Sequence, residues 1–235
     1  MIVLPEDGSL RCITQPDHAH FSGELLSLWR ADGLPDHPRR GDLIFAAREH
    51  DNGWREADAA PRWDAERSRP HDFLSLPREE RIEIWERGTS RYAAARSYAA
   101  LLITRHALNL FQDRRGEEAW ATFVAFLTDL EESLFEETGV PREELEADYR
   151  FIDLADQISL AVCNGWRQPV ERHGVRIAFA DDEVRLDPFP LAGATTFMVP
   201  CRRIPRRVYG GDADLGGELA AAKWGELKVR VAPLS

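Results

Sequence analysis

The stretch of sequence best suited to chemistry is an adjacent histidine and aspartate, His50 and Asp51. A short helix that Asp42 caps and that ends near Asp51 would place His50 one turn after Ala46, on the apolar face. An imidazole nitrogen and a carboxylate oxygen are both good ligands for divalent cations. The pair therefore predicts a metal centre, provided that further ligands converge on it.

His18 is the first candidate partner, because hydrophobic periodicity predicts that it faces inward. Pro16 and Asp17 are typical of a helix start, with Asp17 as the expected N-cap. The apolar stripe of this helix begins at Phe21, one turn after His18, whereas His20 falls on the polar face.

His106 is the second candidate, because it lies within the apolar stripe of a long predicted helix. Thr89 or Ser90 would cap this helix, which ends near Asp113. Asp156 is the third candidate and occupies the apolar stripe of a later helix.

An unpaired carboxylate on an apolar face is costly, so a cation is expected to meet Asp156. Asp153, one turn earlier, falls on the polar face of the same helix and is predicted to point toward solvent.

The periodicity predicts a mainly α protein with a helical core over residues 16–166, and an α+β content overall. A β-hairpin over residues 1–15 and C-terminal antiparallel strands would pack beside the core, and all 235 residues would form a single domain. Residues 167–235 and the hairpin form the predicted β-rich accessory region. Its later strands are expected at residues 175–179, 183–186, 195–199 and 227–231, with the first turn at Ala180, Asp181 and Asp182.

Residues 55–76 are rich in proline and are predicted to be irregular, with Trp63 and Phe73 as anchors. Because this segment follows the His-Asp pair directly, it either covers the site or wraps the surface.

Composition narrows the classes of partner. The net charge of −11 disfavours nucleic-acid binding, and no apolar run approaches the roughly 18–20 residues that span a bilayer. The N-terminus lacks the basic and apolar segments of a signal peptide, so a cytoplasmic protein is expected. The three cysteines are scattered and odd in number, which disfavours a disulfide framework or a thiolate zinc site.

Together, His18, His50, Asp51 and Asp156 would suit one divalent ion such as Mn, Fe, Zn, Ni or Mg. His106 would bind a second metal ion or act as a proton donor. A single helical histidine is more often an ordinary core residue, so the prediction rests on the joint pattern. A bound cation can activate water for attack on an electrophile such as phosphorus.

This order of residues resembles the HD-domain superfamily of metal-dependent phosphohydrolases. The chain is also similar to an uncharacterised bacterial family of unknown function within that group. The resemblance rests on four segments: Ile13 to His18, Arg48 to Trp54, Ser97 to His106, and Leu154 to Asp156.

The resemblance implies a helical core and the metal ligands His18, His50, Asp51 and Asp156, with His106 as a ligand of a second metal. Asp51 and His106 are the implied catalytic residues. Two-metal members have two middle histidines, and only His106 is evident here.

Asn-Gly-Trp follows the His-Asp pair, where Ile-Gly-Lys is common in the superfamily and the lysine often holds phosphate. Arg48, Arg55 and Arg105 are therefore the candidate substrate-binding residues, because guanidinium groups suit phosphate oxygens.

The first functional hypothesis is thus a metal-dependent phosphohydrolase with one or two metal ions, acting on a small phosphorylated molecule or nucleotide. A di-iron oxygenase is one alternative. A non-enzymatic binding or sensing module with a structural or vestigial metal site is another. The sequence predicts no nucleic-acid or membrane partner and leaves a homodimer open.

Overall fold

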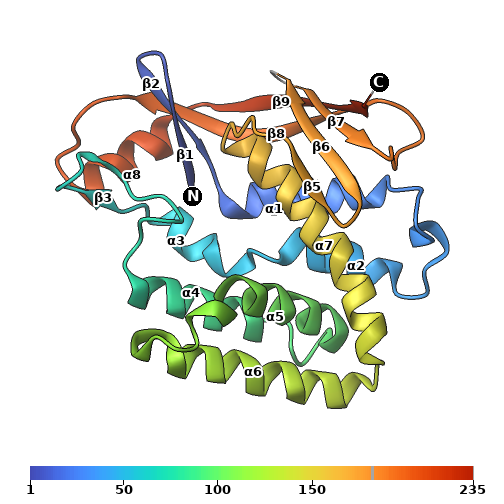
Figure 1. The fold of residues 1–235 in the computed structure, drawn as a ribbon. Coiled ribbons are helices and arrows are strands. Elements are labelled where there is room, and N and C mark those ends of the chain that lie inside the picture. Colours follow the sequence, from blue (N-terminus) through green and yellow to red (C-terminus); the bar gives the residue numbers. More distant parts are fainter. Residues whose placement is uncertain (181–182, 235) are drawn as a thin grey trace.

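The computed structural model describes residues 1–180 and 183–234, so Asp181 and Asp182 of the predicted turn lie outside the described residues. Figure 1 shows a stack of helices against one face of a β-sheet. The helices are α1 (Gln15–Ser27), α2 (Arg40–Glu49), α3 (Arg55–Ala59), α4 (Arg78–Ser90), α5 (Ser97–Phe111), α6 (Glu118–Thr138), α7 (Arg142–Cys163) and α8 (Asp212–Ala221).

The large sheet has seven strands in the order β1-β2-β8-β9-β7-β6-β5. These strands are β1 (Ile2–Glu6), β2 (Ser9–Ile13), β5 (Val170–Arg172), β6 (Val175–Ala180), β7 (Glu183–Asp187), β8 (Thr195–Pro205) and β9 (Trp224–Pro233). Neighbouring strands are antiparallel except β7 and β9, which are parallel. A second, two-stranded sheet pairs β3 (Trp63–Asp64) with β4 (Arg69–Pro70), within the segment predicted to be irregular.

The prediction of a mainly α protein is wrong, because the sheet is a principal layer of an α+β fold. The N-terminal hairpin joins the C-terminal strands where Leu10 of β2 pairs with Ile204 of β8. Alternation of apolar residues identifies single strands but carries no information about pairing between residues so far apart. Moreover, β8 and β9 are both longer than the five-residue strands expected from the sequence.

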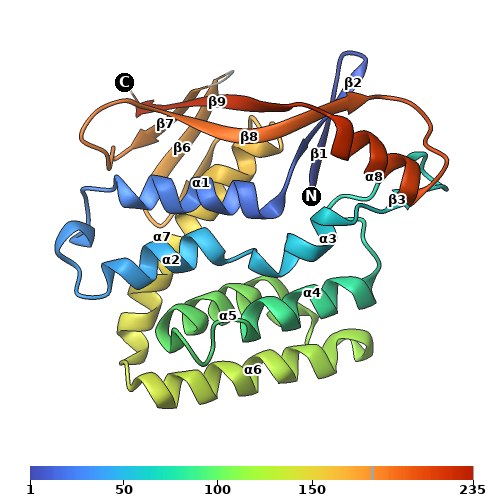
Figure 2. The ribbon, with the colours of Figure 1, turned by 180° about the vertical axis from the view of Figure 1, so that it is seen from behind.

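The helices form successive layers beneath the sheet, as the two opposite views in Figures 1 and 2 show. Helix α1 packs on the sheet, where the Phe21 and Phe197 rings lie 5.1 Å apart. Helix α2 packs on α1, α5 packs on α2, and α6 covers α5. Helix α7 contacts α1, α2 and α5, so one face of α7 can meet side chains from all three helices.

Three predicted helix starts need correction. Asp42 was expected to cap the helix that ends near Asp51, but it lies in the first turn of α2, which begins at Arg40. The side chain of Thr14, rather than that of Asp17, caps α1 by accepting a hydrogen bond of 3.1 Å from the Asp17 backbone N–H. Thr89 and Ser90 were expected to cap the helix that carries His106. They instead form the last residues of α4, and α5 begins only at Ser97. None of the described helices is long and apolar enough to cross a membrane.

Candidate metal centre

Five histidine and aspartate side chains meet where the four helices α1, α2, α5 and α7 approach one another. His18 comes from α1, His50 and Asp51 from the C-terminal end of α2, His106 from α5 and Asp156 from α7. The first four are buried, and the Asp156 side chain is 14% exposed. The structure thus brings together every metal ligand that the sequence suggested. We call these five residues the His/Asp cluster.

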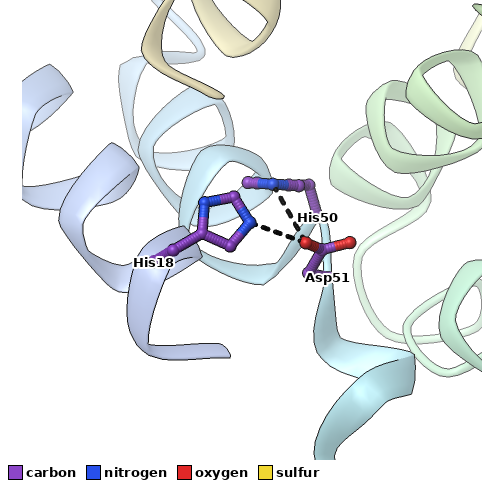
Figure 3. Close-up of side chains that lie close together, drawn as sticks. All are labelled: His18, His50 and Asp51. Carbon is purple, nitrogen blue, oxygen red and sulfur yellow. Dashed lines mark hydrogen bonds and ion pairs between the residues drawn. The ribbon is translucent and has the colours of Figure 1, made fainter. Parts of the chain in front are cut away.

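The ligand atoms of the cluster are close enough to share a cation. His18 Nε2 lies 2.7 Å from Asp51 Oδ2, and His50 Nε2 lies 3.6 Å from the same oxygen. Dashed lines mark both contacts in Figure 3. His50 Nε2 also lies 3.2 Å from Asp156 Oδ1, and His106 Nε2 lies 3.9 Å from Asp156 Oδ2. Two overlapping triads, His18–His50–Asp51 and His50–His106–Asp156, each keep their ligand atoms within 4.8 Å of one another. These buried groups could hold a metal ion.

His50 is the centre of this arrangement, and its tautomer is set by the backbone. Its Nδ1 atom donates a hydrogen bond of 2.8 Å to the carbonyl of Ala47, so in the neutral ring the lone pair is on Nε2. Nε2 is buried and has no hydrogen-bond partner, although two carboxylate groups face it. Buried polar atoms are normally satisfied, so this lone pair requires a cation, which can be a proton or a metal ion. The residues present therefore fit a bound metal.

The electrostatics of the cluster favour a positive charge at its centre. Burial opposes protonation of His50, but the charges of Asp51 and Asp156 outweigh it and raise the pKa of His50 to about 9. Burial would raise the pKa of Asp156, yet the neighbouring histidines, His50 first, hold it well below its ordinary value. The pKa of Asp51 is lowered in the same way, by His50 and His18. Burial lowers the pKa of His106, so its ring is neutral near pH 7.

Two serines hold His18 in place behind the cluster. Ser159 Oγ lies 2.9 Å from His18 Nδ1, donates to the Asp156 carbonyl at 3.0 Å, and lies 2.7 Å from Ser22 Oγ. When Ser159 gives its proton to that carbonyl or to Ser22, its oxygen can accept from His18 Nδ1–H, and His18 Nε2 then faces Asp51 Oδ2.

Gln15 and Tyr149 complete this supporting shell. Gln15 Nε2 donates to Asp51 Oδ2 at 3.1 Å, and the Tyr149 hydroxyl lies 3.2 Å from His106 Nδ1. Sequence reasoning did not identify Ser22, Ser159, Gln15 or Tyr149 as functional. Ser22 and Ser159 had a usable signal, since each lies three or four residues from a ligand on the same apolar stripe.

The segment after the His-Asp pair is fixed against α4 by a contact between backbones. Asn52 Nδ2 donates to the carbonyls of Glu49 and Gly88, at 2.8 and 2.9 Å. A Cβ atom on Gly53 would lie 2.1 Å from the Ile84 carbonyl oxygen, which no side chain can accommodate. The lack of a side chain at Gly53 thus lets α4 lie directly beside the cluster.

A cavity of about 210 Å³ opens onto the cluster and is bounded mainly by α4, α5 and the segment that precedes α4. Its polar lining includes His18, Asp51, His106 and Asp156, and two arginines, Arg81 and Arg114, also line it. Aromatic and aliphatic side chains form the rest of the wall: Trp54, Phe73, Leu74, Trp85, Leu110, Phe111 and Leu160. A cavity with ligands at one end and apolar walls has the form of a small-molecule site.

Comparison with known proteins places the chain in a family. The family model described as "Protein of unknown function (DUF3891)" matches residues 1–206, which include all five cluster residues. The chain belongs to this DUF3891 family. No curated protein matches the chain. No solved structure matches it either.

In this DUF3891 protein, the three arginines suggested for substrate binding do not line the cavity. Arg48 is an exposed residue of α2. Arg55 is engaged with Glu49 at 2.5 Å, and Arg105 forms ion pairs with Glu131 and Glu146. The sequence pattern placed them near ligand residues in the chain, but Arg48 is exposed, and the side chains of Arg55 and Arg105 are directed to glutamates that do not line the cavity.

Asp153 also differs from its prediction, because it is buried rather than turned to solvent. Its carboxylate accepts hydrogen bonds from Arg172 Nε and His173 Nε2, both at 2.6 Å. The hairpin of β5 and β6 folds back over α7 and supplies these partners. Burial would raise the pKa of Asp153, but Arg172 and His173 outweigh it and lower the pKa.

Proposed function

We propose that the chain is a metal-dependent hydrolase that acts on a small phosphorylated molecule. The observation that carries the proposal is the buried Nε2 atom of His50, which lies between two carboxylates without a hydrogen bond, next to a cavity lined by the other four cluster residues. A bound divalent cation lowers the pKa of water and polarises a phosphoryl oxygen, which is the chemistry that such a hydrolysis needs.

His18, His50, Asp51 and Asp156 would hold the cation. Three imidazoles in the cluster favour Mn, Fe, Ni or Zn over Mg, which prefers oxygen ligands. His50 belongs to both triads but has only one ring nitrogen free, because Nδ1 is bonded to Ala47. It can therefore serve one cation, and this favours one metal ion per chain over the di-iron alternative.

His106 is suited to move a proton. It lines the cavity, its ring is neutral because burial lowers its pKa, and its Nδ1 atom is within 3.2 Å of the Tyr149 hydroxyl. With Nδ1 engaged there, Nε2 is available to exchange a proton with a substrate oxygen. Asp51, fixed by Gln15, would orient the reacting groups.

The order of the ligands along the chain supports this assignment by resemblance. A histidine on the first helix, an adjacent His-Asp pair and an aspartate on a late helix are the pattern of HD-domain phosphohydrolases. We therefore propose membership of that superfamily together with the hydrolase activity.

The first test is the metal content of protein purified without an affinity tag. We expect about one equivalent of metal per chain, lost in Asp156→Ala because a ligand is removed. His20→Ala is the matched control, since His20 lies on α1 two residues from His18 but outside the cluster; this variant should keep its metal.

Activity is then measured on a panel of phosphomonoesters, phosphodiesters and nucleotides. Turnover by the wild type and its loss in Asp156→Ala support the proposal. A metal-loaded wild type that turns over no member of the panel would refute it.

A further inference from the structure

Two arginines reach the cavity from different segments and lie on the same aromatic ring. Arg81 is in the first turn of α4, and Arg114 ends the short 3-10 turn Gln112–Arg114 that follows α5. Their guanidinium carbons lie 5.1 and 5.0 Å from the centroid of the Trp120 ring. Both side chains also line the cavity that contains His106 and Asp156. Trp120 thus holds two positive charges at the cavity.

Arg81 is unusual among the arginines of its helix because no carboxylate neutralises it. In the described part of the chain it forms no ion pair, and its buried Nε atom has no hydrogen-bond partner. The other two arginines of α4 are paired: Arg78, three residues before Arg81, with Glu79, and Arg87, six residues after it, with Glu56.

Arg114 has only a weak partner. Its guanidinium lies 3.9 Å from Glu117, and both side chains are about half exposed, at 43% and 55%. Exposed pairs of this kind contribute little, so the charge of Arg114 stays largely available.

The two charges also affect one another. Burial, and after it the positive charge of Arg114, lower the pKa of Arg81 below its ordinary value, although an arginine stays protonated in a protein. Two like charges held together with no counter-charge except the exposed contact of Arg114 with Glu117 are unexpected in a chain with 41 acidic residues and a net charge of −11. A ligand anion would relieve both the repulsion and the unsatisfied donors.

The rest of the cavity rim is apolar and exposed. Leu74 is 64% exposed and Leu110 is 50% exposed, and both line the cavity beside the arginines. Large exposed aliphatic side chains next to a charged pair indicate a ligand with an anionic group and an apolar body.

We propose that Arg81 and Arg114 bind the phosphate group of an organic phosphomonoester, and that Leu74 and Leu110 contact its apolar body. Two guanidinium forks match the double charge and the several oxygens of a phosphate better than the single charge of a carboxylate. The assignment of phosphate rests on the proposed hydrolase function, whereas the presence of an anion site does not.

The test is binding of phenylphosphonate, measured by isothermal titration calorimetry. Its carbon–phosphorus bond is not hydrolysed, so affinity is measured without turnover. Arg81→Gln and Arg114→Gln should each weaken binding by about tenfold or more, because each removes charge-assisted hydrogen bonds. Added salt should weaken binding by the wild type.

Arg78→Gln is the matched control. Arg78 lies one turn before Arg81 on α4 but outside the cavity, so its removal should change the affinity by less than about twofold. Arg81→Lys keeps the positive charge but loses the planar guanidinium group, so this variant should bind phenylphosphonate with intermediate affinity. An intermediate affinity also shows that the variant is folded and that the loss of binding is not due to unfolding.

Metal content of the same variants separates this inference from the hydrolase proposal. Binding of phenylphosphonate that depends on both arginines supports the anion site even in protein without metal. The inference is overturned if the wild type does not bind, or if both Gln variants bind as the wild type does while metal and turnover are present. Binding of phenylacetate as tight as that of phenylphosphonate would overturn the assignment to phosphate.

Discussion

The His/Asp cluster has a counterpart elsewhere in the molecule that also brings a histidine and carboxylates within metal-binding distance. His37, Glu144 and Asp148 keep their ligand atoms within 4.8 Å, and His37 Nε2 lies 3.1 Å from Asp148 Oδ1. Arg39, however, forms ion pairs with both acidic residues, and the Tyr98 hydroxyl donates to Asp148. In this second group a guanidinium already occupies the position of the cation.

The difference between the two groups lies in unmet charge rather than in the number of ligands. No arginine or lysine forms an ion pair with Asp51 or Asp156 in the described residues, and the buried Nε2 of His50, 3.2 Å from Asp156 Oδ1, makes no hydrogen bond. At Asp148, neighbouring side chains already neutralise the carboxylate and donate hydrogen bonds to it, so a metal ion is not needed there. Proximity of ligands is therefore a weak criterion for a metal site, and an unsatisfied buried lone pair is a stronger one.

The two groups should differ most in metal binding when one histidine is removed from each. His50→Ala should abolish metal binding, whereas His37→Ala should leave it unchanged, as measured by elemental analysis after dialysis. A chelator should lower the Tm of the wild type and of His37→Ala but not that of His50→Ala. Loss of metal from His37→Ala alone would reverse the comparison.

A smaller effect is expected from Arg39→Met, which removes the internal cation from the second group. Asp148 is buried and would lose one partner, so the free energy of unfolding should fall by about 1–3 kcal/mol, less than for a fully buried pair because Arg39 is 29% exposed. Urea denaturation measures this change.

The double variant His50→Ala/Arg39→Met tests whether carboxylates without a neutralising arginine are sufficient to create a metal site. Zinc should then raise the Tm of the double variant and not that of His50→Ala alone, because only the double variant frees Glu144 and Asp148 from the charge of Arg39. An equal zinc response in both would show that charge is not the deciding factor.

The smallest change in metal binding should follow from Ser159→Ala. Ser159 contacts His18 Nδ1 and not the Nε2 atom that would bind the metal. The substitution removes the hydrogen bond that fixes the His18 tautomer, so metal affinity should fall by about tenfold, measured by competition with a chelator. Ser27→Ala, at the exposed end of α1, is the control and should have the affinity of the wild type. Unchanged affinity in Ser159→Ala would mean that the protein does not need this bond to orient His18.

The cluster could be predicted from the sequence because the helix face on which each ligand side chain lies is a local property. Helical periodicity alone predicts that His18, His106 and Asp156 face inward, and inward faces of packed helices meet. Asp153 was misplaced because its partners, Arg172 and His173, come from a hairpin about 20 residues later. No periodicity records that such a hairpin returns over α7.

Arg81 and Arg114 were missed for a related reason. They lie on opposite sides of α5 in the sequence and meet only through the ring of Trp120. The size of the sheet was also missed, since the full lengths of β8 and β9 depend on pairing with neighbouring strands and not on local alternation. Local patterns thus predict which way a side chain points, while charge partners and strand neighbours depend on the completed fold.

The contact of Gly53 with α4 has a consequence for how this site can change over time. Because Gly53 and Gly88 both lack a side chain, neither can become smaller to compensate for growth of the other. Single substitutions at these two glycines therefore cannot change the spacing between α4 and the His-Asp pair in small steps. Diversification toward larger substrates, whether natural or by directed evolution, must proceed through the exposed rim at Leu74 and Leu110, where side chains can be exchanged without moving a helix.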